Sequence, residues 1–256
     1  MSELVHYQVD REIATVTLDS QDNRNALSAQ LVDELSARLR TAGADDAVRA
    51  VVLTHTGTTF CAGADLREQS AEGGSEKGTG RMLGLLRSVV ELPKPVVARI
   101  DGHVRAGGLG LVGACDIAIA SQDATFAFTE VRLGLAPAII SLTTLDRMIA
   151  RSVSRYYLTG ETFDAAAAVQ AGLITAATEG AAEMDEELSA ITDALSACSP
   201  QGLAETKLLS TRALRAAFAE HADDMRALSA RLFASSEARA GMAAFLQRRP
   251  APWIAS

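Results

Sequence analysis

Strand-like apolar runs alternate with helical segments through about the first 180 residues of this chain. Residues 50–54 form a short apolar run of the buried-strand type, and residues 95–100, 116–120 and 125–128 are further strand-like runs. Residues 81–91 lie between the first two runs and repeat apolar side chains at helical spacing. Consecutive strands joined by a helix pair in parallel. The pattern therefore predicts an α/β fold with a largely parallel sheet.

The N-terminal region is expected to form a hairpin and then a helix. Residues 4–9 and 13–18 alternate apolar and polar side chains around a short polar turn, the pattern of two paired strands. Ser28 then stands where a helix N-cap is expected, with leucines at helical spacing after it. The chain therefore enters the alternating region through a hairpin and one amphipathic helix.

Beyond about residue 180 the sequence changes character. Ala, Glu, Leu and Arg dominate, and helical periodicity continues almost to the end of the sequence. Ser199-Pro200 has the form of an N-cap followed by proline at the first helical position. We therefore divide the chain into a core, residues 1–195, and a helical region, residues 196–256. The apolar faces of the helical region cover either their own core or other subunits.

The segment 70–80 is expected to be a loop. It contains four glycines and no large apolar side chain. Such a composition predicts a solvated connection rather than a helix or strand, and a lid over a pocket is the alternative interpretation.

Composition narrows the class of protein. The 256 residues carry a formal net charge of −8, which argues against a nucleic-acid partner, because phosphate binding needs basic side chains. No apolar stretch approaches the roughly 18 residues of a membrane helix, and the N-terminal residues lack the pattern of a secretory signal. Cys61, Cys115 and Cys198 fit neither a disulfide framework nor a zinc site. We expect a cytoplasmic protein without nucleic-acid or membrane partners.

One glycine motif is a false signal for a dinucleotide. Gly108, Gly110 and Gly113 match G-x-G-x-x-G, the fingerprint that places a pyrophosphate at the start of a long helix. Only two residues separate Gly113 from the strand expected at 116–120, so no such helix fits. We therefore do not expect NAD or NADP binding.

Two turns rich in small residues follow predicted strands. The first is at 59–66 and the second at 101–108. Small residues allow backbone N–H groups to approach a ligand closely, and a helix start adds positive potential. Tight packing between strand and helix would require glycine as well, so neither turn alone identifies a site.

Taken together, these segments resemble the crotonase superfamily, which is the enoyl-CoA hydratase/isomerase family. The resemblance spans about residues 4 to 180, with a weaker helical match beyond. The matching segments are Asn25-Ala26-Leu27, Phe60-Cys-Ala-Gly-Ala-Asp-Leu66, Leu92-Pro-Lys-Pro-Val-Val-Ala98, Asp101-Gly-His-Val-Arg-Ala-Gly-Gly108, Ala114-Cys-Asp-Ile-Ala-Ile-Ala120, Glu130-Val-Arg-Leu-Gly-Leu-Ala-Pro137 and Leu158-Thr-Gly-Glu-Thr-Phe-Asp164.

The resemblance implies a fold, an assembly and a substrate. The fold is a spiral of ββα units followed by helices that build a homotrimer or a dimer of trimers. The substrate is an acyl-CoA thioester, whose oxygen accepts hydrogen bonds from the amides of Ala64 and Gly107. No metal or redox cofactor is implied, since CoA arrives as part of the substrate. The residues expected to contact it are Arg24, Ala26, Ala62, Asp65, Leu66 and Gly110, although Arg24 is equally well explained as a solvated side chain and Asp65 as a helix cap.

The sequence departs from the family at one catalytic position. Family hydratases use two glutamates, of which the second matches Glu130, whereas the first falls on Gly110. The favoured interpretation is a hydratase in which Glu130 activates water alone, with room at Gly110 for a bulkier acyl group. The runner-up is an enoyl-CoA isomerase, which needs a single base. A weakly active acyl-CoA binding protein is the third.

His103 and Arg105 flank the second turn. A neutral hydrogen-bonded histidine and an arginine paired with a nearby carboxylate are the ordinary expectations. The bolder hypothesis is that one of them meets the carboxylate of a dicarboxylic, 3-methylglutaconyl-type acyl chain.

Overall fold

A six-stranded sheet forms the centre of the protein. The computed structural model describes residues 2–69 and 74–254, and the strands of this sheet are ordered β1-β2-β3-β5-β7-β10. β1 and β2 pair antiparallel, whereas the other neighbours pair in parallel, which confirms the prediction of a largely parallel sheet. The bounds are β1 Val5–Asp10, β2 Ile13–Leu18, β3 Ala50–His55, β5 Val96–Ile100, β7 Ile117–Ser121 and β10 Ala176–Thr178.

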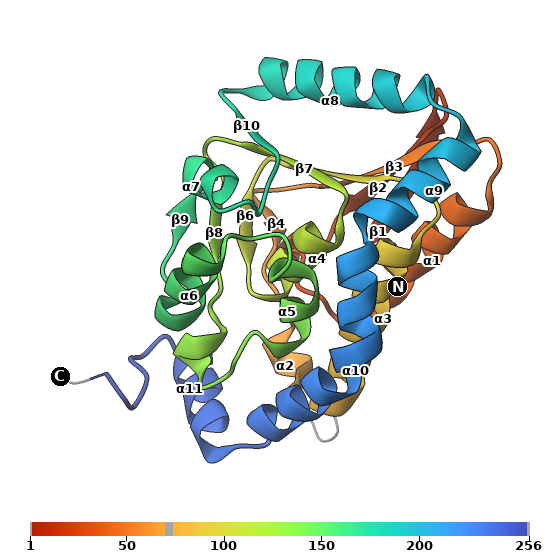
Figure 1. Ribbon diagram of the computed structural model, residues 1–256. Helices are drawn as coiled ribbons and strands as arrows, with labels where there is room; N and C mark the ends of the chain where they lie inside the picture. Colours follow the sequence, from red (N-terminus) through yellow and green to blue (C-terminus); the bar gives the residue numbers. More distant parts are fainter. Residues whose placement is uncertain (1, 70–73, 255–256) are drawn as a thin grey trace.

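A second sheet of four short strands has the order β4-β6-β8-β9. Its strands are β4 Thr59–Cys61, β6 His103–Arg105, β8 Thr125–Ala127 and β9 Phe163–Asp164. Each of β3, β5 and β7 in the large sheet is followed by one strand of this sheet and then by a helix. The chain therefore climbs as a spiral of ββα units, as expected (Figure 1).

The helices of the core fill the connections between strands. The Ser28 hydroxyl accepts the N–H of Leu31 at 3.3 Å and caps α1 as predicted. The loop predicted at 70–80 is wrong for residues 74–80, which form the start of α3, and residues 70–73 lie outside the described chain. The bounds are η1 Gln21–Asn23, α1 Ala29–Ala44, α2 Leu66–Gln69, α3 Gly74–Glu91, α4 Gly107–Ala114, η2 Glu130–Leu133, α5 Ala138–Thr144, α6 Ala150–Thr159 and α7 Ala165–Gln170.

Four helices follow β10: α8 (Ala181–Ser196), α9 (Pro200–Ser210), α10 (Arg212–Phe233) and α11 (Ser236–Leu246). Ser199 caps α9 by accepting the N–H of Gly202 at 3.1 Å, as predicted. In Figure 1, α8 runs across one edge of the molecule, whereas α10 descends along α3 and α5. α11 then returns to pack against η2. α10 and α11 therefore pack on the core of this chain. In the part of the chain that the structure describes, no helix has the length and apolar character of a membrane span.

A buried ion pair fixes α9 to the core. The Lys207 ammonium lies 2.7 Å from Asp116 Oδ2 and also donates to the carbonyl oxygens of Val89 (2.9 Å) and Lys94 (3.0 Å). Asp116 in turn accepts the N–H of Val96 at 2.8 Å. Lys207 is only 4% exposed. Its contacts hold the end of α3 and the residues just before β5 and β7 to α9.

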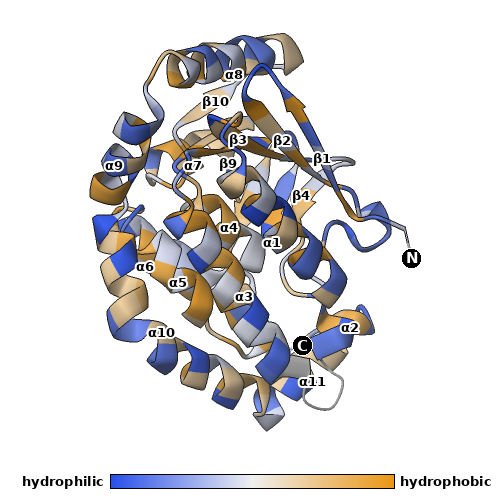
Figure 2. Cartoon of the chain, turned by 90° about the vertical axis from the view of Figure 1, so that its right-hand side faces the viewer, coloured by the Kyte–Doolittle hydropathy of each residue, from blue (hydrophilic) through white to orange (hydrophobic). Residues whose placement is uncertain are grey.

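The distribution of apolar and polar side chains follows this architecture. Figure 2 shows apolar residues concentrated in the strands and in α4 and α5, with hydrophilic residues along α10. Every residue from Gly108 to Ala114 of α4 is buried. The short helix α4 therefore packs between α5, α3 and the strands β4 and β6 of the small sheet.

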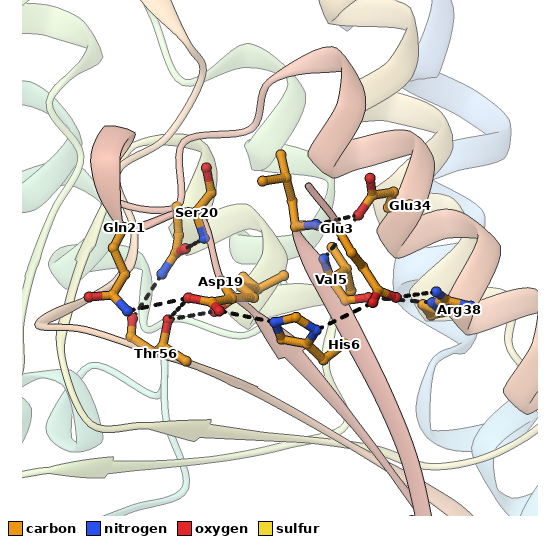
Figure 3. Close-up of polar contacts among 12 residues, drawn as sticks. Glu3, Val5, His6, Asp19, Ser20, Gln21, Glu34, Arg38 and Thr56 are labelled. Carbon is orange, nitrogen blue, oxygen red and sulfur yellow. Dashed lines mark hydrogen bonds and ion pairs between the residues drawn. The ribbon is translucent and has the colours of Figure 1, made fainter. Parts of the chain in front are cut away.

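A polar network at the first strand holds the segment that leads to the site. Figure 3 shows Asp19 between His6, whose ring nitrogen is 3.0 Å away, and the hydroxyl of Thr56. The Glu34 carboxylate of α1 accepts the N–H of Val5 at 3.0 Å. Ser20 follows with its N–H donated to Asn25 Oδ1 at 2.7 Å. The segment from the end of β2 to residue 25 is therefore held by the contacts of Asp19 with His6 and Thr56 and by the hydrogen bond between Ser20 and Asn25.

Candidate active site

The first predicted turn follows β4 and pairs with the segment before α1. The N–H of Ala62 donates to the carbonyl of Arg24 at 3.1 Å, and the N–H of Leu27 donates to the carbonyl of Gly63 at 2.8 Å. Gly63 has φ +89°, and a Cβ at this position would lie 2.9 Å from the Cβ of Ala106. Only glycine therefore fits the turn without strain.

The second turn lies between β6 and α4 and centres on Ala106. This alanine has φ 45° and ψ −119°, a conformation that non-glycine residues seldom adopt. Its N–H donates to the carbonyl of Ala127 at 3.0 Å and its carbonyl accepts the N–H of Leu109 at 2.8 Å. Strained backbone persists where neighbouring structure enforces it, commonly at functional sites. The turn makes Gly107 the first residue of α4, where N–H groups lack intrahelical partners.

The two turns meet. The Cα of Gly63 lies 3.5 Å from the position of a Cβ on Gly107. Within the described chain, neither the amide of Ala64 nor that of Gly107 donates to another protein group. Two free backbone donors from separate ββα units are thus brought together, one of them at the positive end of a helix. Such a pair can stabilise negative charge on a ligand oxygen.

Both amides belong to residues that line a cavity of about 650 Å³. Its walls come from the segments at 22–26 and 62–67, the turn before α4, η2, α5 and one face of α3 and α10. Phe233, Phe245 and Leu246 also line it, so the C-terminal helices complete the cavity. The sequence-predicted residues that line it are Arg24, Ala26, Ala62, Ala64, Asp65, Leu66, Gly107 and Glu130.

Of the carboxylates that line the cavity, Asp22, Asp65 and Glu130, Glu130 is the one with a buried, unpartnered oxygen. It begins η2, shortly after β8, and its Oε2 atom is buried without a hydrogen-bond partner among the described residues. Burial raises the pKa of Glu130 to about 7, opposed weakly by a hydrogen bond from its own backbone N–H. A carboxyl with a pKa near neutrality can accept and return a proton at physiological pH. This environment is the one that a general base requires.

Gly110 differs from its expected role. It lies in α4, and a Cβ there would be 2.5 Å from Cγ2 of Ile140 and 3.2 Å from Cδ1 of Leu86. Ile140 of α5 therefore fills the space that the missing side chain leaves, and Gly110 does not belong to the cavity wall. The space beside Gly110, where room for a bulkier acyl group was expected, is thus occupied by Ile140 and Leu86. No local sequence pattern points to Ile140, because its contact with α4 exists only in the folded chain.

Two residues at the cavity mouth have mixed roles. The Asp65 carboxylate accepts the N–H groups of Arg67 at 3.0 Å and Glu68 at 3.4 Å, so it caps α2 as well as lining the cavity. Arg24 has an exposed side chain and a left-handed backbone with φ 58°. It reaches the cavity wall from the same segment that pairs with the first turn.

Arg105 and His103 both line the cavity and share a partner. The Arg105 guanidinium donates to the carbonyl of Thr125 at 2.6 Å and to its hydroxyl at 2.8 Å. His103 Nδ1 lies 3.0 Å from the same hydroxyl. The expected carboxylate partner of Arg105 is thus replaced by oxygens of β8. Burial, and then the charge of Arg24, lower the pKa of Arg105.

The fold and this pair of turns define a family. The sequence model of enoyl-CoA hydratase/isomerase matches residues 8–255, and the chain belongs to that family. The crystal structure of an enoyl-CoA hydratase from Mycobacterium avium is 50% identical, with a TM-score of 0.92 over 99% of this chain and 100% of that one. An enoyl-CoA hydratase from Shewanella pealeana is 30% identical, with a TM-score of 0.77 over 98% of this chain and 96% of that one. The mitochondrial enoyl-CoA hydratase of Pongo abelii is 29% identical over 93% of this chain and 82% of its own length.

Proposed function

We propose that this protein adds water to the double bond of a 2-enoyl-CoA thioester. One observation carries the proposal: the free amides of Ala64 and Gly107 and the buried carboxyl of Glu130 belong to the same cavity. The names of the relatives support the reaction class.

The two amides act on the thioester oxygen. When a nucleophile adds at C3, the electron pair of the C2–C3 double bond moves toward C1 and negative charge builds on that oxygen. The N–H groups of Ala64 and Gly107 then donate to it. A preorganised donor of this kind contributes about 3–4 kcal/mol to the stability of the transition state.

Glu130 moves one proton. Its carboxylate takes a proton from water as the water oxygen bonds to C3, and the protonated carboxyl then delivers that proton to C2. The glutamate ends the cycle as it began, and the product is a 3-hydroxyacyl-CoA. Both steps suit a group whose pKa is about 7.

The remaining cavity residues are proposed to hold CoA. Ala26, Ala62 and Leu66 supply surface around the free amides, and Arg24 at the mouth supplies a cation for phosphate. CoA arrives with the substrate, and the proposed steps use only backbone amides, one carboxylate and water.

A second candidate is the isomerisation of 3-enoyl-CoA to 2-enoyl-CoA. The specific observation that favours it is Ile140, which fills the place beside Gly110 where a second carboxylate would stand. One carboxylate in an apolar wall is sufficient to remove a proton from C2 and return it to C4. A weakly active acyl-CoA binding protein is the third candidate.

The discriminating experiment is a panel of CoA thioesters followed by the absorbance of the conjugated enoyl group. A hydratase removes that absorbance from 2-enoyl substrates, whereas an isomerase creates it from 3-enoyl substrates. Glu130→Gln lowers kcat at least about 10²-fold in either case, and Glu205→Gln, at an exposed position of α9, is the control. A near wild-type rate in Glu130→Gln, or binding without any absorbance change, contradicts catalysis by Glu130.

A dicarboxylic, 3-methylglutaconyl-type chain is a narrower form of the proposal. Its support is that Arg105 and His103 line the cavity, although Arg105 is already engaged by Thr125. A branched acyl chain is the other narrower form, but the space expected for it beside Gly110 is occupied by Ile140. Both thioesters belong in the same substrate panel.

We further propose that residues 196–256 build a homotrimer or a dimer of trimers. Exposed leucines on α9 support this: Leu208 is 42% and Leu209 74% exposed. Sedimentation equilibrium measures the assembly directly. A cytoplasmic location is proposed on the buried thiols of Cys61 and Cys115, which suit a reducing compartment.

A further inference from the structure

Two buried hydroxyl groups face each other on the wall of the cavity. Thr79 belongs to α3 and Ser229 to α10, and these helices pack side by side (Figure 1). Thr79 is 4% and Ser229 8% exposed, yet both line the same cavity as Gly107 and Glu130. Both residues therefore border the cavity with only a small part of their surface exposed.

The hydroxyl pair has apolar neighbours along its own two helices. Met82 of α3 and Phe233 of α10 lie on the same faces of these two helices, and Ile139 of α5 completes the wall. A hydroxyl in such surroundings is unfavourable unless each of its hydrogen-bonding groups has a partner. Each donor and acceptor of the two hydroxyls therefore needs a partner.

The hydrogen bonds within the protein leave one hydroxyl proton without an acceptor. The two Oγ atoms are 3.3 Å apart, so one hydroxyl donates to the other. Two hydroxyls carry two protons, and the described residues provide no acceptor for the second one.

Other helical hydroxyls in this protein behave differently. Helical threonines commonly donate to the carbonyl one turn earlier, and several do so here. These are Thr41, Thr144, Thr192 and Thr211, at distances from 2.6 to 3.1 Å. Thr79 and Ser229 instead turn away from their own helices and toward each other. Their free donor is consequently available to the cavity.

The charge around the pair selects the kind of ligand. From α3 and α10 the cavity wall receives Gly78, Thr79, Met82, Ser229 and Phe233, none of which is charged. The arginines of the wall lie on other segments of the chain. A carboxylate next to the hydroxyl pair would lose its hydration without gaining a cation, so an uncharged oxygen suits the site better.

We propose that Thr79 and Ser229 determine acyl specificity by binding an uncharged oxygen, a hydroxyl or a carbonyl, carried on the acyl chain of the thioester. The inference rests on the proposed function, because it assigns the acyl chain to this cavity. The free hydroxyl proton is donated to the acyl oxygen. Where that oxygen belongs to a hydroxyl group, the hydroxyl can in turn donate to the side-chain oxygen of Thr79 or Ser229.

The experiment compares matched 2-enoyl-CoA thioesters of one chain length. One series carries a single hydroxyl at successive carbons beyond the double bond, and the reference is unsubstituted. The measured quantity is the ratio of kcat/KM for hydroxylated over plain substrate. The wild type shows a ratio above one for at least one position. Thr79→Val and Ser229→Ala lower that ratio about 10-fold, which corresponds to about 1.4 kcal/mol for one hydrogen bond.

Two controls separate recognition from a purely structural bridge between the helices. Thr79→Ser keeps a hydroxyl and retains the preference. Thr211→Val removes a buried hydroxyl that donates to Lys207 outside the cavity, and leaves the ratio unchanged. If every hydroxylated substrate is poorer than the plain one, or if Thr79→Val leaves the ratio unaltered, the inference is wrong while the proposed reaction stands.

A binding measurement keeps the test independent of turnover. Calorimetry with saturated acyl-CoA esters, plain and hydroxylated, compares the two affinities in wild type, Thr79→Val and Ser229→Ala. Failure of the proposed reaction shows as no absorbance change with any enoyl substrate, whatever the binding preference. A preference for the hydroxylated ester that disappears in both variants supports the inference, and equal affinities in the wild type overturn it.

Discussion

Replacing Glu130 by glutamine is predicted to stabilise the protein at alkaline pH while it removes activity. In the folded chain, burial raises the pKa of Glu130 to about 7 from an ordinary value of 4.5. The unfolded chain therefore releases this proton at lower pH than the folded protein. The contribution of this carboxyl to the free energy of unfolding is fully present below about pH 4.5, and it is lost as the pH rises through 7.

The size of this stability change follows from the difference between the two pKa values of Glu130. Each pH unit corresponds to about 1.4 kcal/mol, so the ionised group costs the folded state about 3 kcal/mol, most of it between pH 5 and pH 8. Glutamine has the same shape and does not ionise in this range. The free energy of unfolding of Glu130→Gln minus that of the wild type should therefore increase by about 2–3 kcal/mol from pH 5 to pH 8.

Urea denaturation of both proteins at pH 5, 6, 7 and 8 measures this difference, and titrations elsewhere in the chain cancel. In parallel, kcat/KM of the wild type on a 2-enoyl-CoA should rise with pH to a midpoint near 7, because the carboxylate is the base. Glu205→Gln is the exposed control. A stability difference that is constant across this range, or a flat rate profile below pH 7, would refute the buried, unpartnered carboxylate.

Two further predictions concern packing. Lys207→Met leaves Asp116 without its partner and should lower the free energy of unfolding by about 3–5 kcal/mol. Adding Asp116→Asn should restore part of that stability. An unchanged urea midpoint in Lys207→Met would contradict a structural ion pair. Gly63→Ala forces a left-handed alanine against Ala106 and should lower kcat by about 10²-fold through displacement of one amide donor. Its control is Gly84→Ala, because a Cβ at Gly84 meets nothing within 4 Å, and equal rates in the two variants would argue against the paired turns.

The alternation of strands and helices was readable because it follows from local periodicity. The runs that form β3, β5 and β7 are predominantly apolar, and every residue of β3 is buried, as expected for a strand covered on both faces. β4 and β6 were read only as turns. They are three residues long, and their strand conformation comes from pairing within the small sheet rather than from a pattern of their own.

The site was predictable to the extent that its groups belong to local motifs. Glu130, Ala64 and Gly107 were named from the family resemblance, and the chain brings them to one cavity. The environment of Gly110 was not predictable, because Ile140 reaches it from another helix. The hydroxyls of Thr79 and Ser229 were missed for the same reason: their contact joins α3 to α10 across most of the sequence.

Because α11 packs back onto η2, the cavity depends on a helix that is synthesised after both sheets. A cavity that needs Phe245 and Leu246 for one of its walls is incomplete on a chain still emerging from the ribosome, even when both sheets and the two amide turns have formed. Such a nascent chain would leave its thioester pocket open to water on that side. The cavity is thus complete only once α11 has been synthesised and has folded back onto η2.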